Sequence, residues 1–152
     1  MSDPIQFEGA SPRLALPLLF AGQAQKEFFI NEALLRADLL LHCVVEGERQ
    51  APPANPAAGE AWLVGNAPTG AFIGQADAIA GWTNDGWRFV GARDGMRVFD
   101  RSRQCFRLYS AGWRLPVGPA LPSGGTTVDA EARSILASLL AALAGAGVLA
   151  AP

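Results

Sequence analysis

The longest stretch of helix-forming residues in the chain runs from Gly22 to His42. It contains no proline, it has no glycine after Gly22, and it is rich in Ala, Leu, Glu and Gln, so the pattern predicts a helix. At about 100° per residue, its apolar side chains fall on two opposite sides. One side holds Ile30, Ala33, Leu34, Ala37 and Leu41, and the other holds Phe28, Leu35 and Leu39. A helix that is apolar on two sides has to be covered on both, so we expect the second side to meet another subunit or particle component.

A second helical pattern begins with Thr127 or Asp129 as its cap and ends near Gly145. Its residues Ala132, Leu136, Leu139 and Leu143 step by four, three and four, which is the seam of a short coiled coil. The uncharged run that follows Arg133 is close to the minimum length of a membrane span, but it is mostly Ala and Gly. We therefore expect a bundle of identical helices or a helix that docks on its own chain, and no membrane insertion. For the bundle, a trimer or a pentamer is expected.

Between the two helices, short apolar runs alternate with turn residues. Segments 78–82 and 87–90 flank Asp85-Gly86, which predicts a hairpin, and segments 96–100 and 104–109 predict another. Segment 44–50 and the apolar run 61–64 add two further strands. The alternation predicts a half-solvated sheet that has its arginines on the water side, namely Arg88, Arg97, Arg107 and Arg114.

The chain before the first helix contains three prolines and is expected to be extended. It could pack on its own domain or on another chain, and the pattern leaves both open. The expected fold class is α+β, with an extended arm, one central helix, a small antiparallel module of hairpins and a C-terminal oligomerising helix. The corresponding segments are an arm at 1–21, a helix with the β module at 22–115, a Pro/Gly linker at 116–128 and a helix with its tail at 129–152.

Composition removes several classes of protein. Half of the 152 residues are hydrophobic and 17% are charged, which is too apolar for a disordered chain and fits one domain. The net charge is −2 and Lys26 is the only lysine, so a nucleic-acid-binding basic stripe is not expected. The first residues lack a basic start followed by an apolar run, so we expect no signal peptide and assembly in the cytoplasm.

Reactive side chains are few and scattered. Cys43 and Cys105 are widely spaced, which favours two buried thiols over a metal site or a disulfide. His42, the only histidine, stands at the expected end of the first helix, where a structural role is the simplest interpretation. Glu46 and Glu48 fit two solvated carboxylates on a strand. With no phosphate-binding glycine motif and no nucleophile elbow, we expect no enzyme, no cofactor and no metal.

The tryptophans of the strand region carry an alternative function. Trp82, Trp87 and Trp113 lie among polar residues and could stack on sugar rings, which would make the module carbohydrate-binding. Filling the core of a thin sheet is the other explanation, and we favour it.

Several motifs resemble a family of unassigned function found in prophages and gene-transfer-agent particles. The matching segments are 12–17, 22–27, 31–34, 51–53, 59–65, 69–72 and 86–89. The run Gly22-Gln23-Ala24-Gln25-Lys26-Glu27 is the most distinctive of them. The tail from Thr127 to Arg133, with its leucines, resembles the closing helix of many phage fibre-type proteins.

This resemblance implies a virion structural protein of the tail-fibre or head-spike type. Because the chain ends at residue 152 without a long distal region, it favours a base or an adaptor over a receptor-binding fibre. The expected partners are further copies of the chain and other virion proteins, with a host cell-surface glycan or capsule as the alternative. The expected interface residues are Phe28, Leu35, Leu39, Leu136, Leu139 and Leu143, and the possible glycan-stacking residues are Trp82, Trp87 and Trp113.

Overall fold

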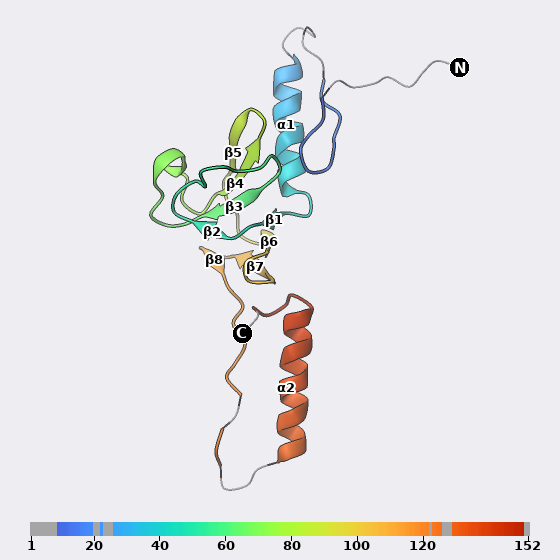
Figure 1. Cartoon of the computed structure of the whole chain (residues 1–152), viewed down its shortest axis with the longest axis vertical. Helices are drawn as coiled ribbons and strands as arrows, with labels where there is room; N and C mark the ends of the chain where they lie inside the picture. Colours follow the sequence, from blue (N-terminus) through green and yellow to red (C-terminus); the bar gives the residue numbers. More distant parts are fainter. Residues whose placement is uncertain (1–8, 20–21, 23–25, 122, 126–128, 151–152) are drawn as a thin grey trace, which may run out of the picture. The chain divides into compact units, whose positions relative to one another are not determined.

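The structure is a computed structural model that describes residues 9–19, 22, 26–121, 123–125 and 129–150. The α+β class expected from the sequence is confirmed, with one central helix, one C-terminal helix and eight short strands among these residues (Figure 1). The elements in chain order are α1 Lys26–Leu40, β1 Val44–Val45, β2 Glu48–Arg49, β3 Ala61–Val64, the 3-10 turn η1 Gly70–Phe72, β4 Ile79–Thr83, β5 Gly86–Val90, β6 Arg97–Asp100, β7 Cys105–Tyr109, β8 Trp113–Arg114 and α2 Ala130–Gly145.

The chain forms two compact units. Unit 1 comprises Met1–Cys43 and Glu48–Gly91, and unit 2 comprises Val44–Gly47 and Ala92–Pro152. The chain therefore enters unit 2 for four residues, returns to unit 1 and then enters unit 2 again. The four-part division expected from the sequence stays a prediction.

Unit 1 contains a four-stranded sheet in the order β2-β3-β4-β5. The hairpin of β4 and β5 is the one predicted around Asp85-Gly86, and Thr83 pairs with Gly86, which has a φ of 110°. Because side chains alternate along a strand, Ala80, Trp82, Trp87 and Phe89 share one face of this sheet. On that face, Phe72 of η1 contacts both Trp87 and Phe89 and is fully buried.

Helix α1 covers the other face of this sheet. Leu35 and Leu39 are its buried apolar residues, at 8% and 5% exposure. A Cβ placed on Gly81 of β4 would come within 2.8 Å of Cδ1 of Leu39, so glycine is what allows this close approach. This arrangement differs from the expected one at Leu35 and Leu39 but not at Phe28. Leu35 and Leu39 face the chain's own sheet, whereas Phe28, Ile30 and Leu41 are exposed.

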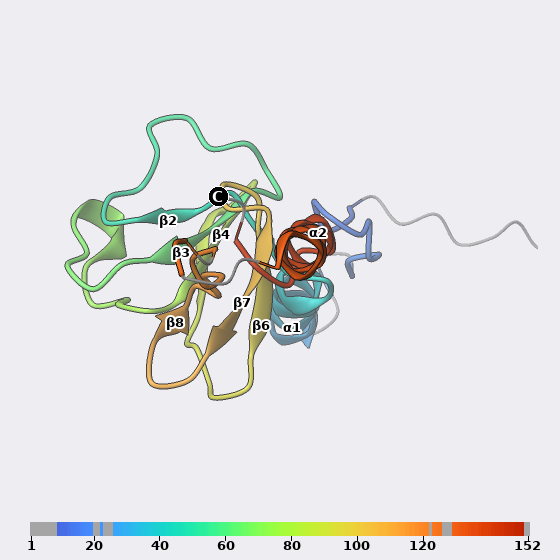
Figure 2. The same ribbon diagram turned by 90° about the horizontal axis from the view of Figure 1, so that it is seen from below.

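Unit 2 contains the second sheet, in the order β1-β6-β7-β8, of which Figure 2 shows β6, β7 and β8. The hairpin of β6 and β7 agrees with the expected pairing of 96–100 with 104–109. Each sheet also carries one parallel pair that the expected antiparallel module did not include, β1 with β6 and β2 with β3. The single strand expected over 44–50 is in fact two strands, which belong to different sheets on either side of Gly47.

Helix α2 is capped at both ends. The Asp129 side chain accepts a hydrogen bond from the Ala132 N–H at 2.8 Å, which confirms one of the two expected N-caps. At the C-terminal end, Val148 N–H donates to the Leu143 carbonyl and Gly147, at φ 70°, donates to the Ala144 carbonyl. These two bonds form a Schellman motif, so the helix stops close to the expected Gly145.

Candidate functional site

The described part of the N-terminal arm is a strap that α1 holds. Residues 9–18 form a small loop, closed by hydrogen bonds from Ser11 N–H to the Leu16 carbonyl and from Leu18 N–H to the Gly9 carbonyl. The side chain of Asp38, 2% exposed on α1, accepts hydrogen bonds from the Ser11 hydroxyl at 2.7 Å and from the N–H groups of Arg13 and Leu14 at 3.0 and 2.6 Å. The carboxylate thus accepts the hydrogen bonds of the three donors that point into the turn of the strap.

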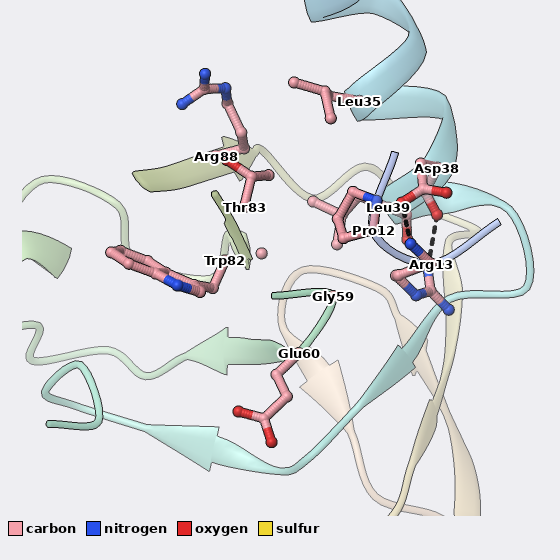
Figure 3. A pocket seen from close by; sticks show the side chains of 11 residues that line it. Pro12, Arg13, Leu35, Asp38, Leu39, Gly59, Glu60, Trp82, Thr83 and Arg88 are labelled. Carbon is pink, nitrogen blue, oxygen red and sulfur yellow. Dashed lines mark hydrogen bonds between the residues drawn. The ribbon is translucent and has the colours of Figure 1, made fainter. Parts of the chain in front are cut away.

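Arg13 of the strap closes the C-terminal end of α1 (Figure 3). Its guanidinium donates to the carbonyls of Asp38 at 2.7 Å, Leu39 at 2.8 Å and His42 at 2.9 Å. The last carbonyls of a helix have no partner within the helix, and a cation there also interacts favourably with the helix dipole. His42, with a φ of 48°, turns the chain out of the helix, as a helix-terminal histidine was expected to do.

A second anchor lies two helical turns earlier. The Asn31 side chain accepts from the Leu19 N–H at 2.8 Å and donates to the Leu19 carbonyl at 3.0 Å. Asn31 and Asp38 are separated by seven residues, 38 − 31, so they lie on the same side of α1. The N-terminal segment is therefore fixed to α1 at two points by polar side chains.

The hollow where strap, helix and sheet meet is too small for a ligand. It is lined by residues that include Pro12, Glu60, Trp82 and Arg88, and its volume is about 10 Å³ (Figure 3). A cavity needs roughly 10–15 Å³ to hold one water molecule. We conclude that the Asp38 clasp, meaning Ser11, Arg13 and Leu14 bound to Asp38, is a structural junction.

The two cysteines are free, buried thiols, as expected. Burial raises the pKa of the Cys43 thiol from 9.0 to about 11, an effect that Arg13 partly opposes. Burial also raises the pKa of Cys105, and nearby Asp100 adds to the rise. A thiol held in its neutral form is a poor nucleophile, so neither cysteine is activated for chemistry.

The raised pKa of Cys43 predicts a loss of stability in alkali. The unfolded chain releases this proton from about pH 9 and the folded chain from about pH 11. The stabilising contribution is therefore complete below about pH 9 and falls by about 3 kcal/mol as the pH rises through that window. Denaturant titrations between about pH 8 and about pH 11 should show a shallower pH dependence in Cys43→Ala than in the wild type. Equal slopes in the two proteins would contradict the prediction.

In unit 2, a buried ion pair replaces the solvated arginine expected on β7. Arg107 is 7% exposed and its Nε lies 2.7 Å from Oδ2 of Asp100, which is fully buried. The other oxygen of Asp100 accepts from the Ser102 hydroxyl at 2.7 Å and from the Arg103 N–H at 3.1 Å. The expected alternation is thus wrong for β7. Cys105 and Arg107 face inward, while Phe106 and Leu108 are 40% and 42% exposed.

The tryptophans proposed for glycan stacking are all half-buried. Trp87 lies within an aromatic cluster, with ring centroids 5.0 Å from Trp82, 5.6 Å from Trp62 and 5.0 Å from Phe72. Trp113 belongs to unit 2, where its ring contacts Tyr109 at 5.2 Å. Edge-to-face contacts of this kind stabilise a core, and they occupy ring surfaces that a sugar would need.

Two of the exposed apolar surfaces include expected interface residues. The first, which we call the Phe28 surface, comprises Phe28 and Phe29 of α1, at 73% and 76% exposure, with ring centroids 6.1 Å apart. The second, which we call the α2 ridge, comprises Ile135, Leu136 and Leu139, at 68%, 47% and 53% exposure. Three of the six expected interface residues lie in these surfaces, Leu143 is half-buried, and Leu35 and Leu39 are core residues of unit 1.

Beside the α2 ridge lies an apolar groove. It is formed by α2 and the extended segment 115–121, which runs along the helix (Figure 1). Within the described ranges, neither helix has both the length and the hydropathy needed to cross a bilayer. No group of three or more metal-ligating side chains occurs among the same residues.

A family model described as "Protein of unknown function (DUF2793)" matches residues 30–114, which is more than half of the chain. The chain belongs to the DUF2793 family. Searches of curated proteins and of solved structures gave no match.

The DUF2793 match covers both anchors of the strap, Asn31 and Asp38, and also the buried pair of Asp100 and Arg107. It ends at Arg114, the last residue of β8. Helix α2 and its groove therefore lie outside the part of the chain that defines membership of DUF2793. The sequence had indicated the ridge through the spacing of its leucines, but the Asp38 clasp was missed. Its signal was a pair of polar residues, Asn31 and Asp38, seven residues apart on one side of the helix.

Proposed function

We propose that the chain is a structural component of a phage or gene-transfer-agent particle, and that it acts as the base or adaptor of a fibre or spike. The observation that carries this proposal is α2. It has 16 residues and a cap at each end, yet none of its side chains is buried. An isolated helix of this length is marginal in water, so its apolar ridge needs a partner.

The Phe28 surface supports an adaptor in particular. It belongs to unit 1, whereas the α2 ridge belongs to unit 2, so the chain offers one apolar surface from each unit. An adaptor has to bind two different neighbours. In this proposal the ridge binds further copies of the chain, and the Phe28 surface binds a particle protein during assembly in the bacterial cytoplasm.

The resemblance to particle proteins gives the second line of support. Its most N-terminal motif, residues 12–17, contains Arg13, whose side chain closes the end of α1. The motif at 31–34 begins with Asn31, which holds Leu19. Both motifs therefore hold the N-terminal segment on α1. Motifs that join two segments of the chain suit a structural role better than a catalytic one.

The alternative of a carbohydrate-binding module has less support. The rings of its candidate residues Trp82 and Trp87 contact each other, and Trp87 also contacts Trp62, so part of their surface is covered.

The test is incorporation into particles. A tagged chain should be found by immunoblotting in gradient-purified particles from a producing strain. Phe28→Asp should lower the incorporated amount about 30-fold or more if this aromatic is a central contact. The matched control is Ala76→Asp, an exposed position of unit 1 outside α1. A chain that accumulates in cells and is absent from purified particles would overturn the proposal.

A further inference from the structure

Helix α2 presents two different apolar sides. One side, with the α2 ridge, is open to solvent. The other side lines the groove together with the chain's own extended segment. The helical residues that line the groove are Ala137, Leu140, Ala141 and Ala144, and the segment contributes Leu115, Val117, Pro119 and Leu121. A ridge and a groove thus lie on the same capped helix.

The groove has the size and chemistry to receive several aliphatic side chains. Its volume is about 570 Å³ and its lining is apolar apart from Arg103. A dry apolar cavity of about 150 Å³ already binds benzene, so this groove has room for more than one side chain. Val117 and Leu121 at its edge are 74% and 56% exposed, so the groove is open to a partner.

The absence of charged residues along most of α2 indicates which kind of partner can bind it. From Ser134 to Ala150 the sequence carries no charged residue. A partner with charged contact residues would lose their hydration without gaining ion pairs, which is costly. The ridge of an identical chain is aliphatic, uncharged and built on a helix of the same length as the one that lines the groove. We propose that the α2 ridge of one copy packs into the groove of the next copy.

The spacing of the leucines brings one residue of the ridge close to one residue of the groove in a parallel pair of helices. With Leu136 and Leu139 at the seam of a coiled coil, Ile135 precedes the seam at position g and Leu140 follows it at position e. In parallel helices, position g of one chain faces position e of its neighbour. Ile135 of the ridge would therefore face Leu140, which lines the groove.

A contact between two different surfaces is heterologous. Each copy then offers a free ridge at one side and a free groove at the other, and such contacts form rings of three or more copies when the rotation between copies closes. A contact of one ridge with one ridge across a two-fold axis would be isologous and would stop at a dimer. The inference rests on the proposed function only in that both place copies of the chain together.

The experiment uses two variants of the full chain that each disable one surface. Ile135→Glu places a charge on the ridge, and Val117→Glu places one at the edge of the groove. Both positions are exposed, so circular dichroism should show an unchanged fold. The matched control is Ser138→Glu, an exposed position of α2 that belongs neither to the ridge nor to the residues that line the groove.

Light scattering coupled to size exclusion should give a single mass of three or more copies for the wild type and for Ser138→Glu. Each disabled variant should assemble only at a protein concentration at least about 30-fold higher than the wild type needs. An equimolar mixture of the two variants should form dimers, because one intact ridge still meets one intact groove.

A wild type that stays monomeric would overturn the inference, as would a monomer whose groove holds a co-purified lipid detected by mass spectrometry. A dimer that Ile135→Glu disrupts and Val117→Glu leaves intact would also overturn it, because the contact would then join two ridges. The failure of one proposal is distinguishable from that of the other. A chain that is monomeric but found in particles would contradict only the proposed ring. A ring that is absent from particles would contradict only the proposed particle role.

Discussion

Replacing Asp38 with alanine is expected to lower the free energy of unfolding of unit 1 by about 3–5 kcal/mol, because three donors lose their acceptor at once. Those donors are the Ser11 hydroxyl and the N–H groups of Arg13 and Leu14. The site is 2% exposed, so water does not readily replace the carboxylate. Guanidinium titrations followed by tryptophan fluorescence measure the loss, since three of the four tryptophans belong to unit 1.

A surface variant on the same helix provides the control for Asp38→Ala. Arg36 forms an i,i+4 ion pair with Glu32, and its side chain is 58% exposed. Arg36→Ala should cost less than about 0.5 kcal/mol. Asp38→Asn retains one acceptor oxygen and should fall between the two. An Asp38→Ala protein as stable as Arg36→Ala would show that the clasp does not stabilise unit 1.

Replacing Arg107 with methionine is expected to destabilise unit 2 by about 3–5 kcal/mol, because it leaves the carboxylate of Asp100 buried without its cation. Tryptophan fluorescence is dominated by unit 1, so hydrogen exchange measured by mass spectrometry is the suitable probe. Peptides that cover β6 and β7 should exchange faster in this variant, whereas peptides from β4 and β5 serve as an internal reference.

The same hairpin supplies a control for Arg107→Met. Arg101 pairs with Glu46 at 2.9 Å, but its side chain is 61% exposed. Arg101→Ala should therefore leave the exchange of β6 and β7 close to that of the wild type. Unchanged exchange in Arg107→Met would contradict the assignment of the Asp100–Arg107 pair to the buried centre of this sheet.

Local signals predicted much of this fold. Asp85-Gly86 marked the β4–β5 hairpin because glycine adopts the positive φ that the turn needs. Asp129 marked the start of α2 and the glycines after it marked the end. In each case the determining interaction lies within a few residues, so a short window of sequence contains it.

The parallel strand pairs could not be predicted in this way. Val44 pairs with Phe99 and Glu48 with Leu63, and these partners are distant in sequence. Gly47, with a φ of 148°, separates the two short strands, yet a glycine in a strand pattern is as compatible with a bulge as with a change of sheet. No local feature of the sequence indicates which sheet each of these two short strands joins.

Buried charged residues explain why side chains of two elements were assigned to the wrong face. Asp38 on α1 and Arg107 on β7 were counted as polar and therefore as solvent-facing. Both are buried because the fold gives them partners, backbone N–H groups for Asp38 and a carboxylate for Arg107. Partners from distant segments are invisible to a periodicity count, so Leu35 and Leu39 beside Asp38, and the two faces of β7 around Arg107, were assigned incorrectly.

The candidate interface was predicted in part for the same reason. Leu136 and Leu139 sit on an element with no buried polar residue, and periodicity placed them correctly on the exposed ridge. Leu35 and Leu39 flank Asp38, and they were assigned to the outside together with Phe28. The groove beside α2 depends on where segment 115–121 runs, which the pattern of the helix does not contain.

The chain passes between the two units after Cys43, again after Gly47 and a third time after Gly91. Cutting any one of these connections leaves two others as tethers, so a single proteolytic nick cannot release either half. A gene fragment that begins at Ala92 would encode β6 without β1, the strand that pairs with its Phe99 and Asp100. The two halves of this protein therefore have to be inherited as one piece, since recombination after Gly91 would separate β1 from the sheet to which it belongs.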